Sequence, residues 1–276
     1  MNISIIIPVY KNKELLQKSF SHNYPFIKDC EIIIVNDYPE ESIEDIFEKY
    51  SSVKLFTNEK NLGFAKTVNR GVKEASGDLL FLLNSDVFLQ DDSFKKAVKL
   101  FTENKKLFAV SFAQIEQDKS IVGKNRVFFK NGFTMHEKAG DISFGPTGWA
   151  EGGTCIIRKS FFDELKGLNE IYSPFYWEDI DLSYRAKKKG YEVLFDPSIK
   201  VLHNHSSTIG KYMKEDFREI ISYRNQFIFT WKNATTSQLF IHLLFLPKIL
   251  IQSVFAGNSN LLKGFFRAAL LVPKMV

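Results

Sequence analysis

Short apolar runs alternate with helical stretches through the first half of the chain, and this alternation restricts the fold more than any other feature. The apolar runs indicate strands at residues 2–10, 30–37, 53–57, 78–84 and 107–113. Helical spacing occupies the segments between them, at residues 11–22, 42–50, 64–76 and 91–104. Unbroken Ile, Leu and Val runs suit strands that are covered on both faces. The pattern therefore predicts an α/β fold with a doubly wound, mostly parallel sheet flanked by helices.

The second half of the chain is less regular. Residues 114–148 are polar and predict a long loop or an irregular hairpin, a kind of segment that is commonly functional. Order returns with a strand near 153–158, a helix near 160–166, a helix near 179–189 and a strand near 191–195. We expect a larger α/β domain over residues 1–210 and a helical C-terminal region over residues 211–276, divided where the acidic residues stop.

Charge is distributed unevenly along the chain. The formal net charge is +5, yet no Asp or Glu follows Glu219. Six basic residues lie beyond it, namely Arg224, Lys232, Lys248, Lys263, Arg267 and Lys274. The rest of the chain is nearly neutral, which argues against nucleic acid as a partner because nucleic-acid binders spread basic surface over the folded domain. With only two cysteines, a disulfide framework is excluded and a reducing compartment such as the cytoplasm is indicated.

The basic tail also contains apolar helical patterns. The N-terminal run lacks the leading charge of a secretory signal. The longest uncharged stretch, 233–247, is shorter than the roughly 20 apolar residues of a spanning helix, so we expect no membrane span. Residues 239–251 are apolar but broken by Pro247, and a stripe of Leu261, Leu262, Phe265, Phe266 and Ala269 follows. Such a stripe packs onto a core, forms an oligomer contact, or lies on an anionic membrane surface.

Polar residues follow three of the predicted strands, and ligands of doubly wound sheets bind at such strand ends. Asn84, Ser85 and Asp86 are either plain turn formers or ligands for a divalent cation that carries a diphosphate. Asp37 is placed to accept hydrogen bonds from a base or a ribose. The segment NLGFAKTVNRG at 61–71 is either a turn with an amphipathic helix or a helix start that binds an anion.

Two further segments carry candidate chemistry. In FYWEDIDLSYR, Glu178, Asp179 and Asp181 precede a helix, where acids complement the helix dipole; this explains Asp181 well. The aromatic residues before them indicate partial desolvation, which tunes a carboxylate for general-base work. In VLHNHSS, His203 and His205 point to opposite sides of a strand, so at most one meets a given site. Imidazole beside carboxylate suits Mn²⁺ better than Mg²⁺.

Taken together, the motifs SIIIPVYKN, IIIVND, NLGFAKTVNRG, LLFLLNSD, GGTCIIR and FYWEDIDLSYR resemble those of the family-2 glycosyltransferases of GT-A fold. Within that family the chain looks most similar to the branch of rhamnosyltransferases and related polysaccharide-building enzymes. The resemblance covers about residues 3–207. It implies inverting, metal-assisted transfer from a nucleotide-diphosphate sugar to a glycan or lipid-linked acceptor in surface polysaccharide synthesis.

The same resemblance assigns roles to residues. The nucleotide-sugar pocket would contain Pro8, Tyr10, Asp37, Asn61, Lys66, Asn69, Asn84 and Ser85, with Asn84 replacing the first Asp of the family's DxD motif. Asp86 and His203 would hold the metal, and Asp179 would be the catalytic base, with its neighbour Glu178 as the weaker candidate. Trp149, Gly153 and Trp177 would lie on the acceptor side. One base and one metal site suffice for single displacement.

Two other classes of function compete with this interpretation. A sugar nucleotidyltransferase shares the sheet and the metal, but it carries a glycine-rich loop after the first strand, where this chain has PVYKNKELL. A non-catalytic module at a membrane surface would not need the intact carboxylates. For the enzyme we expect a cytoplasmic location, peripheral on the inner face of the cell membrane, with the C-terminal region contacting anionic lipid or a second copy in a homo-oligomer.

Overall fold

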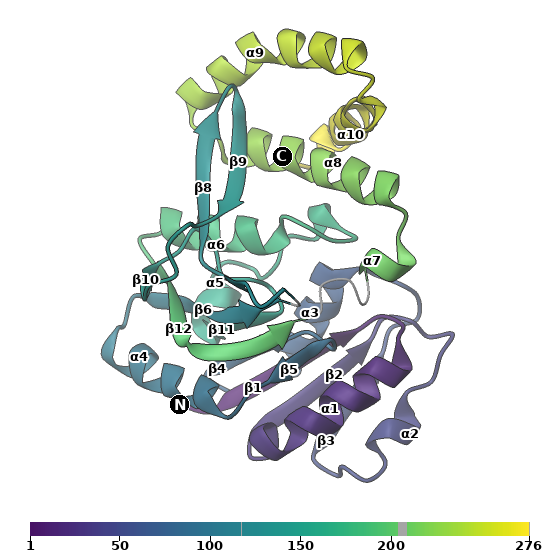
Figure 1. The fold of residues 1–276 in the computed structure, drawn as a ribbon, viewed down its shortest axis with the longest axis vertical. Coiled ribbons are helices and arrows are strands. Elements are labelled where there is room, and N and C mark those ends of the chain that lie inside the picture. The colour runs from purple at the N-terminus through teal and green to yellow at the C-terminus, as the bar shows by residue number, and fades with distance from the viewer. Residues whose placement is uncertain (117, 204–208, 276) are drawn as a thin grey trace.

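A mixed ten-stranded sheet forms the larger part of the molecule, in a computed structural model that describes residues 1–116, 118–203 and 209–275 (Figure 1). Its main path runs β10-β12-β6-β11-β4-β1-β2-β3, with β5 and β7 added beside it. The strands are β1 (Ile3–Val9), β2 (Glu31–Asn36), β3 (Val53–Thr57), β4 (Leu79–Leu83), β5 (Val87–Leu89), β6 (Leu107–Ile115), β7 (Ile121–Val122), β10 (Gly145–Pro146), β11 (Thr154–Arg158) and β12 (Glu192–His203).

Helices cover both faces of this sheet, as the unbroken apolar strands predict. They are α1 (Lys13–Ile27), α2 (Glu44–Phe47), α3 (Phe64–Lys73), η1 (Ser93–Lys96), α4 (Ala97–Glu103), α5 (Lys159–Glu164), η2 (Glu170–Tyr172) and α6 (Glu178–Lys188). Strand β4 shows the consequence: Phe81 packs into one core and its neighbour Leu82 into the other, and both are buried. Strands β3, β2, β1 and β4 run parallel, which confirms the doubly wound, mostly parallel sheet.

Strand β12 is longer than the sequence indicates. The sequence predicts a strand near 191–195, and the next residues, Asp196, Pro197 and Ser198, are turn formers. Instead the ladder is irregular between Asp196 and Lys200 and then resumes, so that β12 continues to His203. The short strand β5, which the sequence analysis missed, pairs antiparallel with this extension and places Val87 opposite His203.

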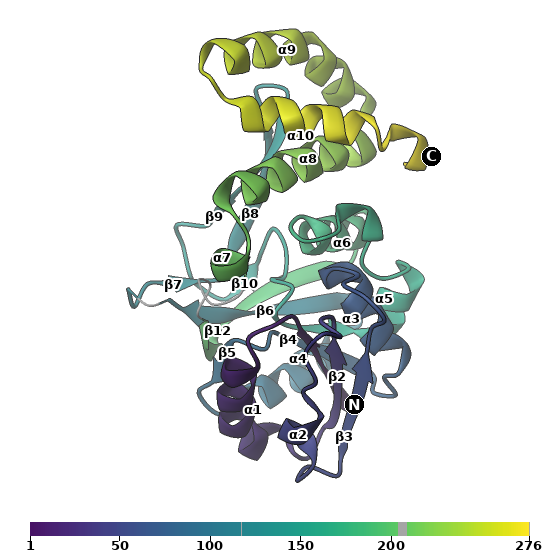
Figure 2. The same ribbon diagram turned by 90° about the vertical axis from the view of Figure 1, so that its right-hand side faces the viewer.

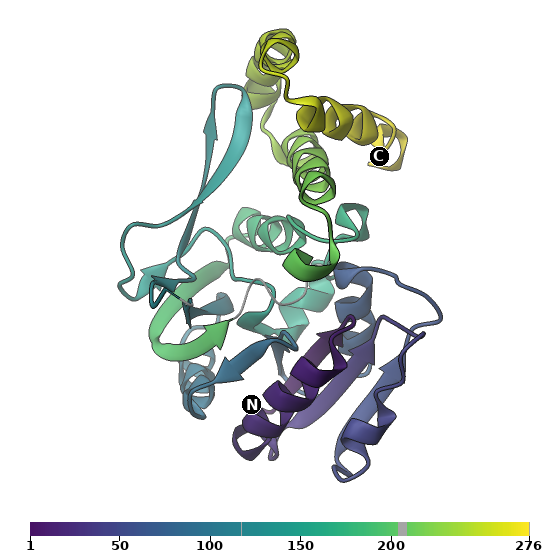
Figure 3. The same cartoon turned by 45° about the vertical axis from the view of Figure 1, so that its right-hand side comes forward.

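The polar segment 114–148 was predicted to be a long loop or an irregular hairpin. It contains a hairpin, but the hairpin is regular. Strands β8 (Asn125–Lys130) and β9 (Phe133–Lys138) form an antiparallel ladder without a register shift. The connecting Asn131 and Gly132 both have positive φ, at 52° and 80°, as a two-residue Asn-Gly hairpin turn requires. The hairpin projects from the sheet toward the C-terminal helices (Figure 3).

The C-terminal region is helical, as predicted, and consists of α7 (Ile209–Tyr212), α8 (Glu215–Asn233), α9 (Thr236–Phe255), α10 (Ser259–Ala269) and η3 (Val272–Lys274). Helix α10 packs closely on α8, because a Cβ added at Gly264 would lie 2.7 Å from Cβ of Tyr223. Part of the predicted apolar stripe, Leu261 and Phe265, therefore faces an internal core, whereas Phe266 is exposed. The division at residue 210 stays a prediction.

Pro247 does not break α9, contrary to expectation. The hydrogen bond that a proline cannot donate would have gone to the carbonyl of Leu243, and both residues lie on the exposed side of the helix. Among the described residues, α9 is the helix that is long and apolar enough to cross a membrane by length and composition, with a mean hydropathy of 1.6. The sequence analysis considered only uncharged stretches and so missed this helix, because Lys248 interrupts its apolar run.

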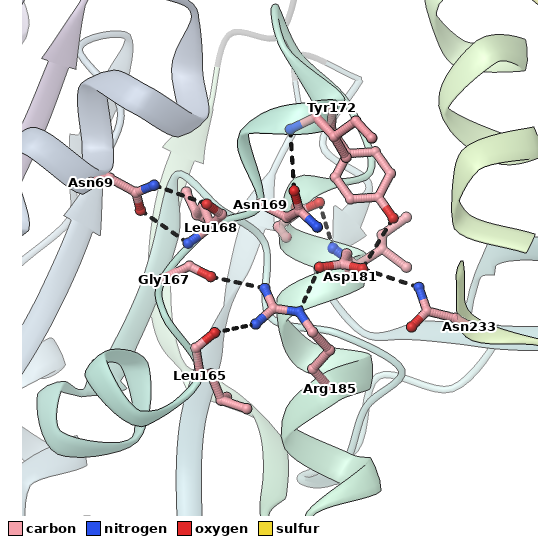
Figure 4. A network of polar contacts seen from close by, with 12 residues as sticks. Asn69, Leu165, Gly167, Leu168, Asn169, Tyr172, Asp181, Arg185 and Asn233 are labelled. Carbon is pink, nitrogen blue, oxygen red and sulfur yellow. Dashed lines mark hydrogen bonds and ion pairs between the residues drawn. The ribbon is translucent and has the colours of Figure 1, made fainter. Parts of the chain in front are cut away.

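A buried polar network joins α6 to the C-terminal helices (Figure 4). Asp181 was expected to complement the helix dipole; it lies in the first turn of α6, and its side chain is fully buried. It accepts hydrogen bonds from Tyr172 Oη at 3.0 Å, Asn233 Nδ2 at 3.0 Å and Arg185 Nε at 2.6 Å. Arg185 also donates to the carbonyls of Leu165 and Gly167, so one carboxylate ties together η2, α6 and the end of α8.

Removing this carboxylate should destabilise the fold strongly. We expect Asp181→Ala to lower the free energy of unfolding by about 3–5 kcal/mol, because it leaves buried donors without a partner. Urea denaturation of the purified variant measures this loss. The control is Lys99→Ala, which breaks the exposed pair with Glu103 (3.7 Å) and should change stability by no more than about 0.5 kcal/mol. Equal stability of the two variants would contradict the role of Asp181.

Candidate active site

A cavity of about 440 Å³ opens at the carboxyl ends of β1, β2 and β4. The chain brings most of the predicted site residues to its wall: Pro8, Tyr10, Asp37, Asn61, Asn84, Ser85, Asp86, Gly153, Glu178, Asp179 and His203. Lys66, Asn69, Trp149 and Trp177 are not among the described residues that line it. His205 lies outside the residues that the structure describes.

Asp37 forms the rigid floor of one end of the cavity. Its Oδ1 accepts hydrogen bonds from Asn58 Nδ2 (2.7 Å) and the amide of Leu62 (2.8 Å), and its Oδ2 accepts from the amide of Gly63 (2.9 Å). Burial raises the pKa of this carboxyl, and the hydrogen bonds act in the opposite direction. Asp37 therefore shapes the loop that presents Asn61, in addition to any contact with a ligand.

Lys66 and Asn69 have partners outside the cavity. Lys66 is 41 % exposed and lies 3.8 Å from Glu170. Asn69 donates to the carbonyl of Leu168 (2.8 Å) and accepts from its amide (2.9 Å), which fixes the loop before η2 (Figure 4). Helical spacing placed both residues on the right helix, but it could not say which side of α3 faces the cavity.

The end of β4 is packed tightly against the turn before β11. The amide of Asn84 donates to the carbonyl of Gly153 at 3.0 Å, and a Cβ at Gly153 would lie 2.1 Å from Asn84 Nδ2. Glycine is therefore required at 153 for the backbone to approach Asn84. The carbonyl of Ser85 accepts a hydrogen bond from Ser19 Oγ at 2.6 Å, which anchors the same turn to α1.

Asp86 and His203 form the candidate metal site. Asp86 Oδ1 lies 3.3 Å from His203 Nε2, and both side chains are buried. His203 Nδ1 lies 2.6 Å from Gln114 Oε1, and this contact orients the ring. The other ring nitrogen, Nε2, faces the carboxylate of Asp86, so that a cation between them would meet one nitrogen and one oxygen donor. One oxygen and one nitrogen donor fit a divalent metal that completes its coordination with phosphate oxygens.

The first turn of α6 places Glu178 and Asp179 in the wall of the same cavity. Asp179 Oδ2 accepts from the amide of Gly152 (3.1 Å) and its Oδ1 from the amide of Ile180 (2.8 Å). Burial raises the pKa of Asp179, while these amide bonds favour its ionised form. Burial, followed by the charge of Asp179, raises the pKa of Glu178 to about 8, and Glu178 Oε2 has no hydrogen-bond partner among the described residues. Backbone amides therefore stabilise the charged form of Asp179, whereas burial and the charge of Asp179 favour the protonated form of Glu178.

Glu151 is a third carboxylate in this wall, and the sequence analysis missed it. Its Oε1 accepts a hydrogen bond from Asn125 Nδ2 at 2.7 Å. The amide of the next residue, Gly152, is the one that donates to Asp179. Burial, then the charge of Asp179, raises the pKa of Glu151 to about 7. The only sequence signal was its position immediately before the Gly152-Gly153 turn, together with a partner, Asn125, in the polar segment.

Aromatic residues support the carboxylates from behind. Trp149 and Trp177 are buried, and the ring of His136 lies edge-on to both, with centroids 5.4 and 4.9 Å apart. Trp177 and Tyr176 both have positive φ (78° and 72°), a costly conformation for bulky residues that the surrounding packing must hold. Phe175 and Tyr176 themselves line the cavity, so the aromatic segment contributes two wall residues, and Trp177 supports them.

Arg218 brings positive charge to an otherwise acidic cavity. It is the one Lys or Arg among the described lining residues, and it comes from α8 in the predicted C-terminal region. Asn225 fixes α8 by donating to the carbonyls of Tyr172, Phe175 and Tyr176, at 2.8 to 2.9 Å. The C-terminal helices therefore help to build the site. Sequence analysis assigned the cation of the pocket to Lys66 and missed Arg218.

The chain resembles known proteins over most of its length. The family model described as glycosyl transferase family 2 matches residues 4–166. Poly-β-1,6-N-acetyl-D-glucosamine synthase of Staphylococcus epidermidis is 27 % identical over 224 residues, which are 78 % of this chain and 53 % of the synthase. This chain thus spans about half the length of that relative.

Two further proteins are similar to this chain, one in part of its sequence and one in its fold. The N-acetylglucosaminyl-diphospho-decaprenol L-rhamnosyltransferase of Mycobacterium tuberculosis is 36 % identical over 66 residues, 24 % of this chain and 21 % of that enzyme. The solved mannosyltransferase PcManGT of Pyrobaculum calidifontis, in complex with GDP-Man and Mn²⁺, shares the fold with a TM-score of 0.61 at 11 % identity, over 97 % of this chain and 87 % of that one. The chain belongs to glycosyltransferase family 2.

Proposed function

We propose that this protein transfers a sugar, with inversion, from a nucleotide-diphosphate sugar to a hydroxyl of a glycan or lipid-linked acceptor in surface polysaccharide synthesis. One observation carries the proposal: the carboxylate of Asp179 shares a single cavity with the buried Asp86–His203 pair. Asp179 would supply a base, and the pair would supply a site for a metal that holds the diphosphate. Single displacement needs a base for the acceptor hydroxyl and is assisted by a metal that stabilises the leaving diphosphate.

Asp179 is the residue that would take the proton of the acceptor hydroxyl. The amides of Gly152 and Ile180 fix its orientation, and the partly desolvated wall raises its pKa. A raised pKa brings the base closer to the pH at which proton transfer is efficient. Glu178 is mostly protonated at neutral pH and therefore unsuited to act as the base.

Asp86 and His203 would hold the metal, with Asn84 and Ser85 beside the diphosphate. A divalent ion bound there would offset the negative charge that develops on the leaving diphosphate. Arg218 adds a fixed positive charge to the same cavity. We propose Mn²⁺ in preference to Mg²⁺ because one of the two protein donors is an imidazole nitrogen.

The known relatives fit this assignment by their names. One builds poly-N-acetylglucosamine, one transfers rhamnose to a diphospho-decaprenol-linked sugar, and one is solved with GDP-Man and Mn²⁺. We propose a cytoplasmic enzyme, peripheral on the inner face of the cell membrane, where lipid-linked acceptors are reached. The excess of basic residues after Glu219 supports that location.

Loss of the base should abolish transfer while leaving donor binding intact. We expect Asp179→Asn to lower kcat by about 10²–10⁴-fold, because the amide cannot accept the proton. The dissociation constant for the nucleotide with Mn²⁺, measured by titration calorimetry, should stay within about twofold. Turnover near that of the wild type would overturn the assignment of Asp179.

The neighbouring carboxyl provides the matched control for that variant. Glu178→Gln replaces a mostly protonated carboxylic acid with an amide of similar shape, so its effect on kcat should be far smaller. If instead Glu178→Gln abolishes transfer and Asp179→Asn does not, the roles of the two residues are reversed.

The metal site can be tested without turnover. We expect Asp86→Ala to remove the dependence of UDP or GDP binding on Mn²⁺, since it deletes the oxygen donor of the pair. Titration of each nucleotide with and without Mn²⁺ measures this dependence. Asp163→Ala, at an exposed position of α5, should leave it unchanged. A Mn²⁺ effect that survives in Asp86→Ala would show that the metal binds elsewhere.

A further inference from the structure

The outward face of helix α9 is apolar. The residues that face away from the rest of the chain recur at helical spacing and are mostly apolar: Phe240, Leu243, Leu244, Ile251, Val254 and Phe255. Phe240 and Leu244 are each 63 % exposed and Phe255 is 88 % exposed. A helix that meets only water presents polar side chains on its outer face. An apolar face of this extent indicates a surface that something covers.

The inner side of α9 is fixed to the body of the protein. His242 is fully buried, with Nδ1 2.6 Å from the carbonyl of Gly132 and Nε2 accepting from Trp231 Nε1 at 2.9 Å. Gly132 forms the tip of the β8–β9 hairpin, and a Cβ there would lie 2.6 Å from Cβ of Phe245. The hairpin tip and α8 therefore hold the helix in place with its apolar side outward.

Helix α9 forms one end of the molecule, opposite the sheet (Figure 1), and lies across that end in the perpendicular view (Figure 2). Its 20 residues would span roughly 30 Å, enough to cross a bilayer. Crossing would carry the attached hairpin tip, with exposed Lys130 and Asn131, into the hydrocarbon, where unpaired polar groups are costly. Lying flat in the interface buries the apolar face and leaves these groups in water.

The charge around α9 identifies the surface that would cover it. Lys248, Lys263, Arg267 and Lys274 are exposed on α9, α10 and η3, and no acidic residue occurs after Glu219. A second copy of the chain, packed face to face, would bring these like charges together. Anionic lipid complements them, at about 1 kcal/mol for each basic residue near the surface.

We propose that α9 docks flat on an anionic membrane, with Phe240, Leu244 and Phe255 inserted and the basic residues of α9, α10 and η3 near the lipid phosphates. The inference rests on the membrane location proposed above. Vesicle binding needs neither donor nor acceptor. The vesicle experiment can therefore succeed or fail independently of the experiments on sugar transfer.

Flotation with lipid vesicles tests the proposal. We expect the wild type to float with vesicles that contain about 30 % phosphatidylglycerol in phosphatidylcholine and less with phosphatidylcholine alone. Leu244→Ser/Phe255→Ser should weaken binding by about tenfold or more, because both side chains lose apolar area that inserts. The matched control, Ile142→Ser/Phe144→Ser, changes two exposed apolar residues away from α9 (42 % and 52 % exposed) and should bind like the wild type.

Circular dichroism of each variant verifies that the fold is retained. Absence of wild-type flotation with anionic vesicles would overturn the proposal, as would unchanged binding of the α9 variant. Analytical ultracentrifugation without lipid tests the other candidate for covering this face, a second copy of the chain. A wild-type dimer that the α9 variant loses, together with no vesicle binding, would assign the face to a second copy and also overturn the proposal.

Discussion

The antiparallel pairing of β5 with β12 is the contact on which the candidate site depends. It places Val87 opposite His203 and so brings Asp86, at the end of β4, within 3.3 Å of a histidine far along the chain. The other edge of β5 is held by the amide of Asn23 on α1, which donates to the carbonyl of Val87 and accepts from the amide of Leu89. Without this pairing the two side chains of the candidate metal site would belong to separate strand ends.

The first turn of α6 and the turn before β11 bring three carboxylates to the same cavity. Two amides donate to Asp179, whereas burial and then the charge of Asp179 raise the pKa of Glu178 and of Glu151. Charge is also separated on the scale of the molecule. The acidic cavity lies near the sheet, and the basic, apolar surface lies on α9 and α10.

The sequence predicted the sheet and most of the cavity because both depend on local patterns. Unbroken apolar runs identify buried strands, and polar residues that follow them converge at one edge, as Asp37 and Asp86 do. The rest depends on contacts distant in sequence. Asp181 gains Asn233 as a partner by the packing of α8, and Arg218 reaches the cavity from the same helix. The Asn131-Gly132 turn was a local signal that the reading of segment 114–148 overlooked.

The stereochemistry of transfer tests single displacement most directly. The donor can be identified as the nucleotide sugar that most raises the Tm of the protein with Mn²⁺, since a ligand of the folded state stabilises it by mass action. Methanol then serves as a small acceptor whose methyl glycoside cannot change its anomeric configuration in solution. Proton NMR should show a product with the configuration opposite to that of the donor. A methyl glycoside of retained configuration would contradict a single base at Asp179 and require a different mechanism.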